Sequence, residues 1–212
     1  MAVTKLTSLE VMQDAPVIPV IVLNDVAHAV PMARALLAGG IRMLEITMRT
    51  PVALECMKAI AREVPDAVIG AGTVRNAANA RAAADAGARF AVSPGYTREV
   101  GQACRDIGLP LLPGVATSSE IMLAQEDGFA QLKFFPAMQA GGVPLLKAWA
   151  GPFHDVQFCP TGGVSLENAP QLLALPNVVV VGGSWLTPGD LMAKGEWGKI
   201  TQMAKDACAL SR

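Results

Sequence analysis

Residues 109–136 read LPLLPGVATSSEIMLAQEDGFAQLKFFP and contain one complete strand–helix–strand unit. The apolar run at 109–114 is predicted to be a strand, and Thr117-Ser-Ser-Glu120 forms a capping box that begins a helix. Asp127-Gly128 is typical of a helix end, and the apolar run at 130–136 follows as the next strand. Strands joined through a helix in this way are expected to lie parallel.

The same rhythm of strand, loop and helix recurs along the whole chain. Short apolar runs that we predict to be strands lie at residues 17–23, 42–47, 67–72, 89–94, 109–114, 130–136, 156–160 and 177–183. Eight strand–helix units favour an α/β fold of the (β/α)8 TIM barrel type, preceded by a short N-terminal helix near residues 4–14. A doubly wound open sheet is the alternative, although no G-x-G-x-x-G opens a first helix. No linker or low-complexity stretch divides the chain, so residues 1–212 are predicted to form a single domain.

Helix boundaries are marked by local signals between these runs. Thr50-Pro51 and Thr187-Pro188 each offer an N-cap followed by proline at the first helical position. Other helices are predicted to end at Gly39-Gly40, Gly87 and Gly108, because a left-handed C-cap favours glycine.

Composition excludes several classes of function. Hydrophobic residues make up 52% of the chain and charged residues 17%, as in a packed globular protein. The net charge of −1 provides no basic field for nucleic acid or an anionic membrane, and no apolar run is long enough to span a bilayer. Four scattered cysteines and two histidines argue against a disulfide framework, a metal centre or a Ser-His-Asp triad, and favour reduced thiols in the cytoplasm.

Lys133 is an unexpected residue in the apolar strand at 130–136. Side chains alternate along a strand, so Lys133 shares a face with Gln131 and Phe135, while Leu132 and Phe134 take the other. If the Leu132 face meets the outer helices, the amine points into the mouth of the barrel. An amine attacks a carbonyl group only in its neutral form, which burial among aromatic side chains favours.

Glu45 is a carboxylate inside another apolar strand, where Met43 and Thr47 share its face. Inward-pointing side chains of these two strands can meet across the barrel mouth, and an amine–carboxylate pair there is suited to acid–base chemistry. A buried ion pair that only holds the barrel together is the alternative, although such pairs are weak stabilisers.

Polar residues at the strand ends suggest contacts to an anionic ligand. Arg49 can grip a carboxylate bidentately and Thr73 can add a hydroxyl group, although a solvated arginine and a turn hydroxyl would fit the same pattern. Thr161-Gly162-Gly163 and Gly182-Gly183-Ser184 end the last two strands, where many barrels bind phosphate through backbone N–H groups. Tight turns are the alternative explanation for these glycines.

The chain resembles the bacterial 2-keto-3-deoxy-6-phosphogluconate (KDPG) and KHG/KDPG aldolases over nearly its whole length. The stretches that carry this resemblance follow one another through all eight predicted strands: PVIPVIV, GGIRMLEITMRT, GAGTV, AVSPGYT, LPGVATSSE, LKFFPA, AGPF, FCPTGGVS and GGSWL.

The resemblance implies a class I aldolase without metal or other cofactor, assembled as a homotrimer. It implies that Lys133 forms a Schiff base, that Glu45 is the general acid/base, and that Arg49 and Thr73 bind the pyruvate carboxylate. Thr161 corresponds to a hydroxyl that orients the substrate, and Gly162, Gly163 and Ser184 correspond to phosphate contacts.

The implied reaction is cleavage of a phosphorylated keto acid to pyruvate and glyceraldehyde 3-phosphate, with 4-hydroxy-2-oxoglutarate as a further substrate. Preference for the galactonate epimer within the same family is one alternative. A sugar-phosphate isomerase or binding barrel that forms no covalent intermediate is another.

Overall fold

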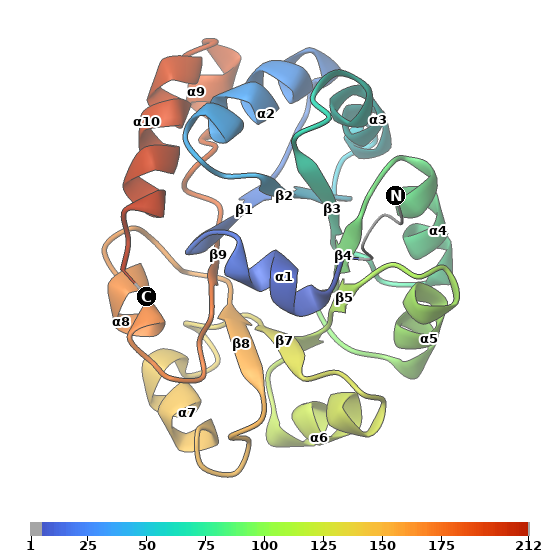
Figure 1. Cartoon of the computed structure of the whole chain (residues 1–212), viewed down its shortest axis with the longest axis vertical. Coiled ribbons are helices and arrows are strands. Elements are labelled where there is room, and N and C mark those ends of the chain that lie inside the picture. The colour runs from blue at the N-terminus through green and yellow to red at the C-terminus, as the bar shows by residue number, and fades with distance from the viewer. Residues whose placement is uncertain (1–5, 212) are drawn as a thin grey trace.

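The computed structural model describes residues 6–211, which adopt an α/β fold with a curled parallel sheet and helices on its outside (Figure 1). Each predicted strand segment contains a strand, because the local apolar patterns are strong. The strands are β1 Val17–Ile21, β2 Met43–Thr47, β3 Val68–Gly72, β4 Phe90–Val92, β5 Leu111–Leu112, β6 Gly114–Val115, β7 Gln131–Phe134, β8 Gln157–Pro160 and β9 Val181–Gly183.

The strands pair in parallel, in the orders β5-β4-β3-β2-β1-β9 and β6-β7-β8. The segment predicted as one strand at 109–114 is divided at Pro113, which has no N–H group to donate. Its first part pairs with β4 and its second part with β7, so one stretch of chain borders both sheets. Isolated parallel bridges, Phe158 with Val178 and Thr161 with Gly182, connect β8 and the residue after it to the β9 segment.

The helices alternate with the strands along the chain. They are α1 Ser8–Gln13, the 3-10 helix η1 Val26–His28, α2 Ala29–Ala38, α3 Ala53–Glu63, α4 Ala77–Asp85, α5 Arg98–Asp106, α6 Ser118–Glu126, α7 Gly142–Trp149, α8 Ala169–Leu173, α9 Gly189–Ala193 and α10 Trp197–Cys208. None of the helices in the described part of the chain has the length and apolar character needed to cross a membrane.

Several helix boundaries follow from local chemistry as predicted. Thr117 and Glu120 form the expected capping box of α6. The glycines that follow α2, α4, α5 and α6 have positive φ angles of 96°, 94°, 67° and 83°, as left-handed C-caps require; they are Gly40, Gly87, Gly108 and Gly128.

Two predicted helix N-caps were wrong, and the N-terminal helix is shorter than predicted. Helix α3 has Val52 as its N-cap and α9 has Pro188, and neither cap makes a side-chain hydrogen bond, so Thr50 and Thr187 cap no helix. The hydroxyl of Thr50 donates to a carbonyl of the preceding strand segment instead. The N-terminal helix expected at 4–14 covers Ser8–Gln13, and residues 4 and 5 lie outside the described residues.

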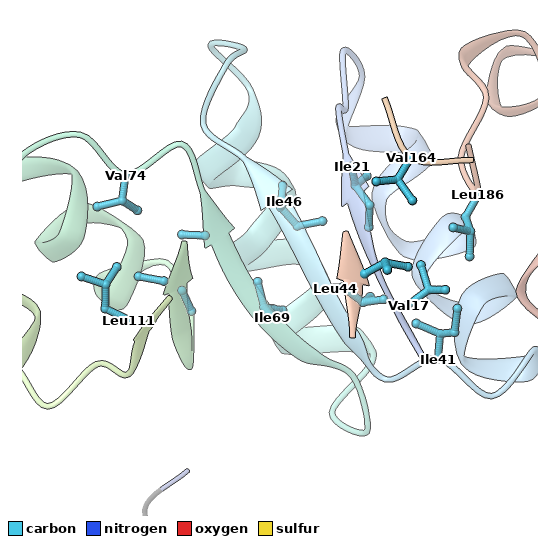
Figure 2. Close-up of a cluster of buried hydrophobic side chains, with 14 of the residues drawn as sticks. Val17, Ile21, Ile41, Leu44, Ile46, Ile69, Val74, Leu111, Val164 and Leu186 are labelled. Carbon is cyan, nitrogen blue, oxygen red and sulfur yellow. The ribbon is translucent and has the colours of Figure 1, made fainter. Parts of the chain in front are cut away.

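Apolar side chains fill two layers, one on each face of the curled sheet. In the outer layer Leu44 and Ile46 of β2 and Ile69 of β3 lie on the face that the helices cover (Figure 2). The inner layer contains Met43, the neighbour of Glu45 on its own face, and is closed at one end by Val11 and Met12 of α1. The sheet alternation therefore directs Glu45 inward, as predicted.

Candidate active site

Lys133 of β7 and Glu45 of β2 meet inside the curled sheet. The Lys133 Nζ donates a hydrogen bond of 3.2 Å to Glu45 Oε1, and the two residues are only 6% and 3% exposed. Their strands come from opposite parts of the chain and from the two different sheets. The predicted pair thus exists as a buried contact, and its carboxylate is close enough to exchange a proton with the amine.

The surroundings of Lys133 combine apolar packing with one aromatic face. Leu132 and Phe134 pack outward into the helix-covered layer, which leaves the amine facing inward. The Lys133 Nζ lies 5.4 Å from the centre of the Phe135 ring. Beside it in register on β8 is Cys159, and burial raises the pKa of this thiol to about 12. The Cys159 thiol is therefore neutral at physiological pH.

Two glycines make room for the candidate site residues Glu45 and Thr161. A Cβ atom on Gly72 of β3 would lie 2.4 Å from Glu45 Oε1, and one on Gly182 of β9 would lie 2.1 Å from Thr161 Oγ1. Neither glycine has a positive φ angle, so the requirement is for space and not for backbone freedom. From the sequence, Gly182 belongs to a turn motif and Gly72 is an ordinary strand glycine, because the contacts that require these glycines cross between strands.

Two adjoining cavities contain all eight residues proposed from the sequence. A cavity of about 170 Å³ is lined by Val20, Glu45, Arg49, Thr73, Pro94, Lys133, Phe135 and Thr161. A second cavity of about 300 Å³ is lined by Val20, Val22, Arg49, Phe135, Thr161, Gly162, Gly163, Val164, Gly182 and Ser184. Arg49 and Thr161 line both, so they lie where the two cavities join. The apolar wall residues could not be identified from the sequence, because side chains of this kind are common in any core.

The backbone around these cavities has unusual geometry. Thr73 has a φ angle of 63°, which a β-branched residue rarely adopts, and strained conformations of this kind cluster at functional sites. Gly162 and Gly163 have φ angles of 101° and 72°, so consecutive residues leave the usual conformations at the wall of the second cavity. Successive N–H groups in such a turn can face an anion together.

Other parts of the described chain offer less chemistry. A cavity of about 410 Å³ lies at the amino-terminal ends of β5 and β7, beside the start of α1, but its Arg105 side chain donates to the backbone of Asp127 and no buried reactive pair faces it. Within residues 6–211, no group of three or more histidine, cysteine or acidic side chains is arranged to hold a metal ion.

Reacting groups at the carboxyl ends of parallel strands are typical of α/β enzymes. A curled parallel sheet with a buried Lys133–Glu45 pair beside a cavity has the features of an α/β enzyme, with Lys133 and Glu45 as its candidate reacting groups. The chain belongs to the KDPG and KHG aldolase family, whose family model matches residues 9–203.

Curated relatives and solved structures agree with this family. The chain is 52% identical to the 2-dehydro-3-deoxy-phosphogluconate aldolase of Pseudoalteromonas atlantica, over 97% of this chain and 95% of the relative. It is 48% identical to the KHG/KDPG aldolase of Escherichia coli, over 96% and 95% of the two chains. A solved KDPG aldolase from Legionella pneumophila, which holds pyruvate as a covalent carbinolamine intermediate, superimposes with a TM-score of 0.95 at 45% identity and covers 97% and 100% of the two chains.

Proposed function

We propose that this protein is a class I aldolase that cleaves 2-dehydro-3-deoxy-6-phosphogluconate to pyruvate and glyceraldehyde 3-phosphate. The observation that carries the proposal is the buried Lys133–Glu45 hydrogen bond of 3.2 Å at the wall of a cavity. The names of the relatives from Pseudoalteromonas and Escherichia coli, and the covalent pyruvate of the Legionella enzyme, support the same reaction. KHG in the Escherichia coli name stands for 2-keto-4-hydroxyglutarate, which is another name for 4-hydroxy-2-oxoglutarate. The name therefore also supports cleavage of this compound to pyruvate and glyoxylate.

In this mechanism Lys133 forms the covalent intermediate. Its neutral amine attacks C2 of the keto acid, and Glu45 supplies and removes the protons that convert the carbinolamine to an iminium ion with loss of water. Glu45, directly or through a water molecule, then takes the proton of the C4 hydroxyl group. The C3–C4 bond breaks, its electron pair moves into the iminium, and glyceraldehyde 3-phosphate leaves.

The second half of the cycle regenerates the lysine. The enamine of pyruvate that remains on Lys133 takes up a proton at C3 and becomes an iminium ion again. Water adds at C2, and pyruvate leaves with its ketone restored. A single carboxylate beside the nitrogen serves both halves, because the protons it takes in one step are required in a later one.

The two cavities fit the two ends of the substrate. Arg49 and Thr73 line the cavity that contains the amine, and we assign them to the keto-acid carboxylate. Gly162, Gly163 and Ser184 line the second cavity, and we assign them to the phosphate group, which backbone N–H groups can bind. Thr161 lies where both cavities meet and is assigned to the substrate hydroxyl groups between them. Binding at both ends would orient the bond that breaks.

Further proposals concern the whole molecule. We propose that the two sheets form one closed (β/α)8 barrel in a single domain, supported by the strand segment split at Pro113 and by the bridges between the β8 and β9 segments. We propose a cytoplasmic location, consistent with four free cysteines. A homotrimer is proposed from the family resemblance, and sedimentation velocity should give three times the 22.1 kDa of one chain.

Trapping the intermediate tests the function directly. The protein is incubated with pyruvate and sodium borohydride, and intact mass is followed by peptide mapping. One reduced pyruvyl adduct on Lys133 is the expected result, together with loss of cleavage activity in a folded Lys133→Ala variant. An unmodified, folded wild-type protein would instead favour a non-covalent isomerase or binding protein.

A further inference from the structure

The loop between β2 and α3 carries Arg49, a cavity-lining residue that no neighbouring side chain holds in place. Arg49 is exposed and, within residues 6–211, its guanidinium group makes no hydrogen bond or ion pair. Its side chain is long and has many rotamers. With no such contact of its own, the side chain is anchored through the backbone of residue 49, whose position sets the space that the guanidinium group can reach.

Hydrogen bonds hold this backbone from two sides. The N–H of Met48, the residue before Arg49, donates to the carbonyl of Gly72 in β3 at 2.9 Å. The hydroxyl of Thr50, the residue after it, donates to the carbonyl of Leu23, just beyond β1, at 2.6 Å. In the sheet β2 lies between β3 and β1. The residues before and after Arg49 are therefore hydrogen-bonded to the strand segments on both sides of β2.

The partner of Thr50 is itself part of the cavity wall. Leu23 is buried and follows Val22, which lines the second cavity, and it lies three residues after Val20, which lines both cavities. A hydrogen bond to its carbonyl therefore fixes the Arg49 loop relative to the space that the substrate would occupy.

The hydroxyl of Thr50 is available for this contact because it caps no helix. A threonine before proline ordinarily accepts a hydrogen bond from the first turn of a helix, but α3 begins at Ala53 and has no side-chain cap. Helix α3 therefore has no side-chain cap, and the Thr50 hydroxyl donates its hydrogen bond to the segment after β1. The bond thus serves the loop and not the start of the helix.

We propose that Thr50 is a positioning residue that sets the Arg49 guanidinium group against the substrate carboxylate. The inference rests on the proposed aldolase function, in which Arg49 binds that carboxylate. Without the hydroxyl, the loop keeps its hydrogen bond to β3 but loses the one beyond β1, so Arg49 samples a wider range of positions. The expected result is weaker substrate binding and not a loss of the covalent chemistry.

Thr50→Val is the decisive variant, because it removes the hydroxyl and keeps the branched shape. We expect KM for the phosphorylated keto acid to rise about tenfold, as for the loss of one well-placed hydrogen bond, while kcat changes less than threefold. The pyruvate concentration that gives half-maximal borohydride trapping on Lys133 should rise by a similar factor. Thr50→Ser keeps the hydroxyl and should remain within about twofold of wild type.

A matched control and a double variant separate positioning from general stability. Thr201 also donates its hydroxyl to a backbone carbonyl, that of Ala35, at 3.0 Å, but it lies on α10, and no residue of α10 lines either cavity. Thr201→Val should leave KM unchanged. In an Arg49→Ala background, Thr50→Val should have no further effect on KM, because both changes remove the same contact.

Several results would overturn the inference. An unchanged KM in Thr50→Val, equal losses in Thr50→Ser and Thr50→Val, or fully additive effects with Arg49→Ala would each do so. In all three cases wild-type protein still traps pyruvate, so the proposed aldolase function would stand. Wild-type protein that does not trap pyruvate would overturn that function and this inference together.

Discussion

Gly72→Ala tests whether the space beside Glu45 is part of the catalytic geometry. Gly72 has no positive φ angle, so alanine can adopt its backbone conformation. The added Cβ would lie 2.4 Å from Glu45 Oε1, 2.8 Å from Cγ and 3.0 Å from Cδ. Since unstrained contacts begin at roughly 3.5 Å, the carboxylate must move by about 1 Å.

A shift of this size matters for chemistry more than for folding. The atoms that move are the end of a flexible side chain, so the fold can adjust around the new methyl group. The Lys133 Nζ to Glu45 Oε1 distance is already 3.2 Å, at the long end of a good hydrogen bond, and a displaced carboxylate no longer reaches the reacting atoms. A misplacement of about 1 Å can cost on the order of 100-fold in rate, which is the fall in kcat that we expect.

The assay is steady-state cleavage of the phosphorylated keto acid, with thermal unfolding measured on the same samples. Gly95→Ala is the matched control, because a Cβ there meets nothing within 4 Å, and its kcat should stay within about twofold of wild type. A folded Gly72→Ala protein with kcat within threefold of wild type would refute the reasoning. Loss of folding in Gly72→Ala would refute the assumption that Glu45 can move aside.

Three further predictions concern stability. Burial raises the pKa of Cys159 to about 12, so the thiol ionises first in the unfolded chain, where its pKa is roughly 8.5. Cys159 alone should therefore lower the free energy of unfolding by about 2 kcal/mol between pH 8 and pH 10, and Cys159→Ala should lack this contribution in urea titrations. Thr117→Ala removes half of the α6 capping box and should cost about 1 kcal/mol, or about 2–4 °C in Tm by calorimetry, whereas Thr117→Ser should not. Phe134→Ala should lower the free energy of unfolding in denaturant by about 3–5 kcal/mol, because Phe134 is fully buried. Phe135→Ala, on the cavity face, should lower it clearly less, and equal losses would contradict the assigned faces.

Local patterns anticipated much of the fold. Thr117 and Glu120 lie one helical turn apart, and the glycines at helix ends need only their own backbone freedom, so neither signal depends on distant residues. The alternation of Lys133 with Leu132 and Phe134 likewise indicated which side chain points inward. The chemical type of Lys133 and Glu45, each alone in an apolar strand, pointed to the pair that the structure brings into contact and that we propose reacts.

Contacts between segments far apart in the chain decided the rest. Thr50 has the sequence of a helix cap, but the Leu23 carbonyl, brought alongside by strand pairing, binds its hydroxyl instead. Gly72 resembles any other strand glycine until β2 is placed beside β3 and the Glu45 carboxylate occupies the space where a Cβ would lie. The sequence by itself determined the elements and the reactive groups, because periodicity and side-chain chemistry are local. Only the tertiary structure decided how those groups are held, since hydrogen-bond partners and free space belong to neighbours that are distant in the chain.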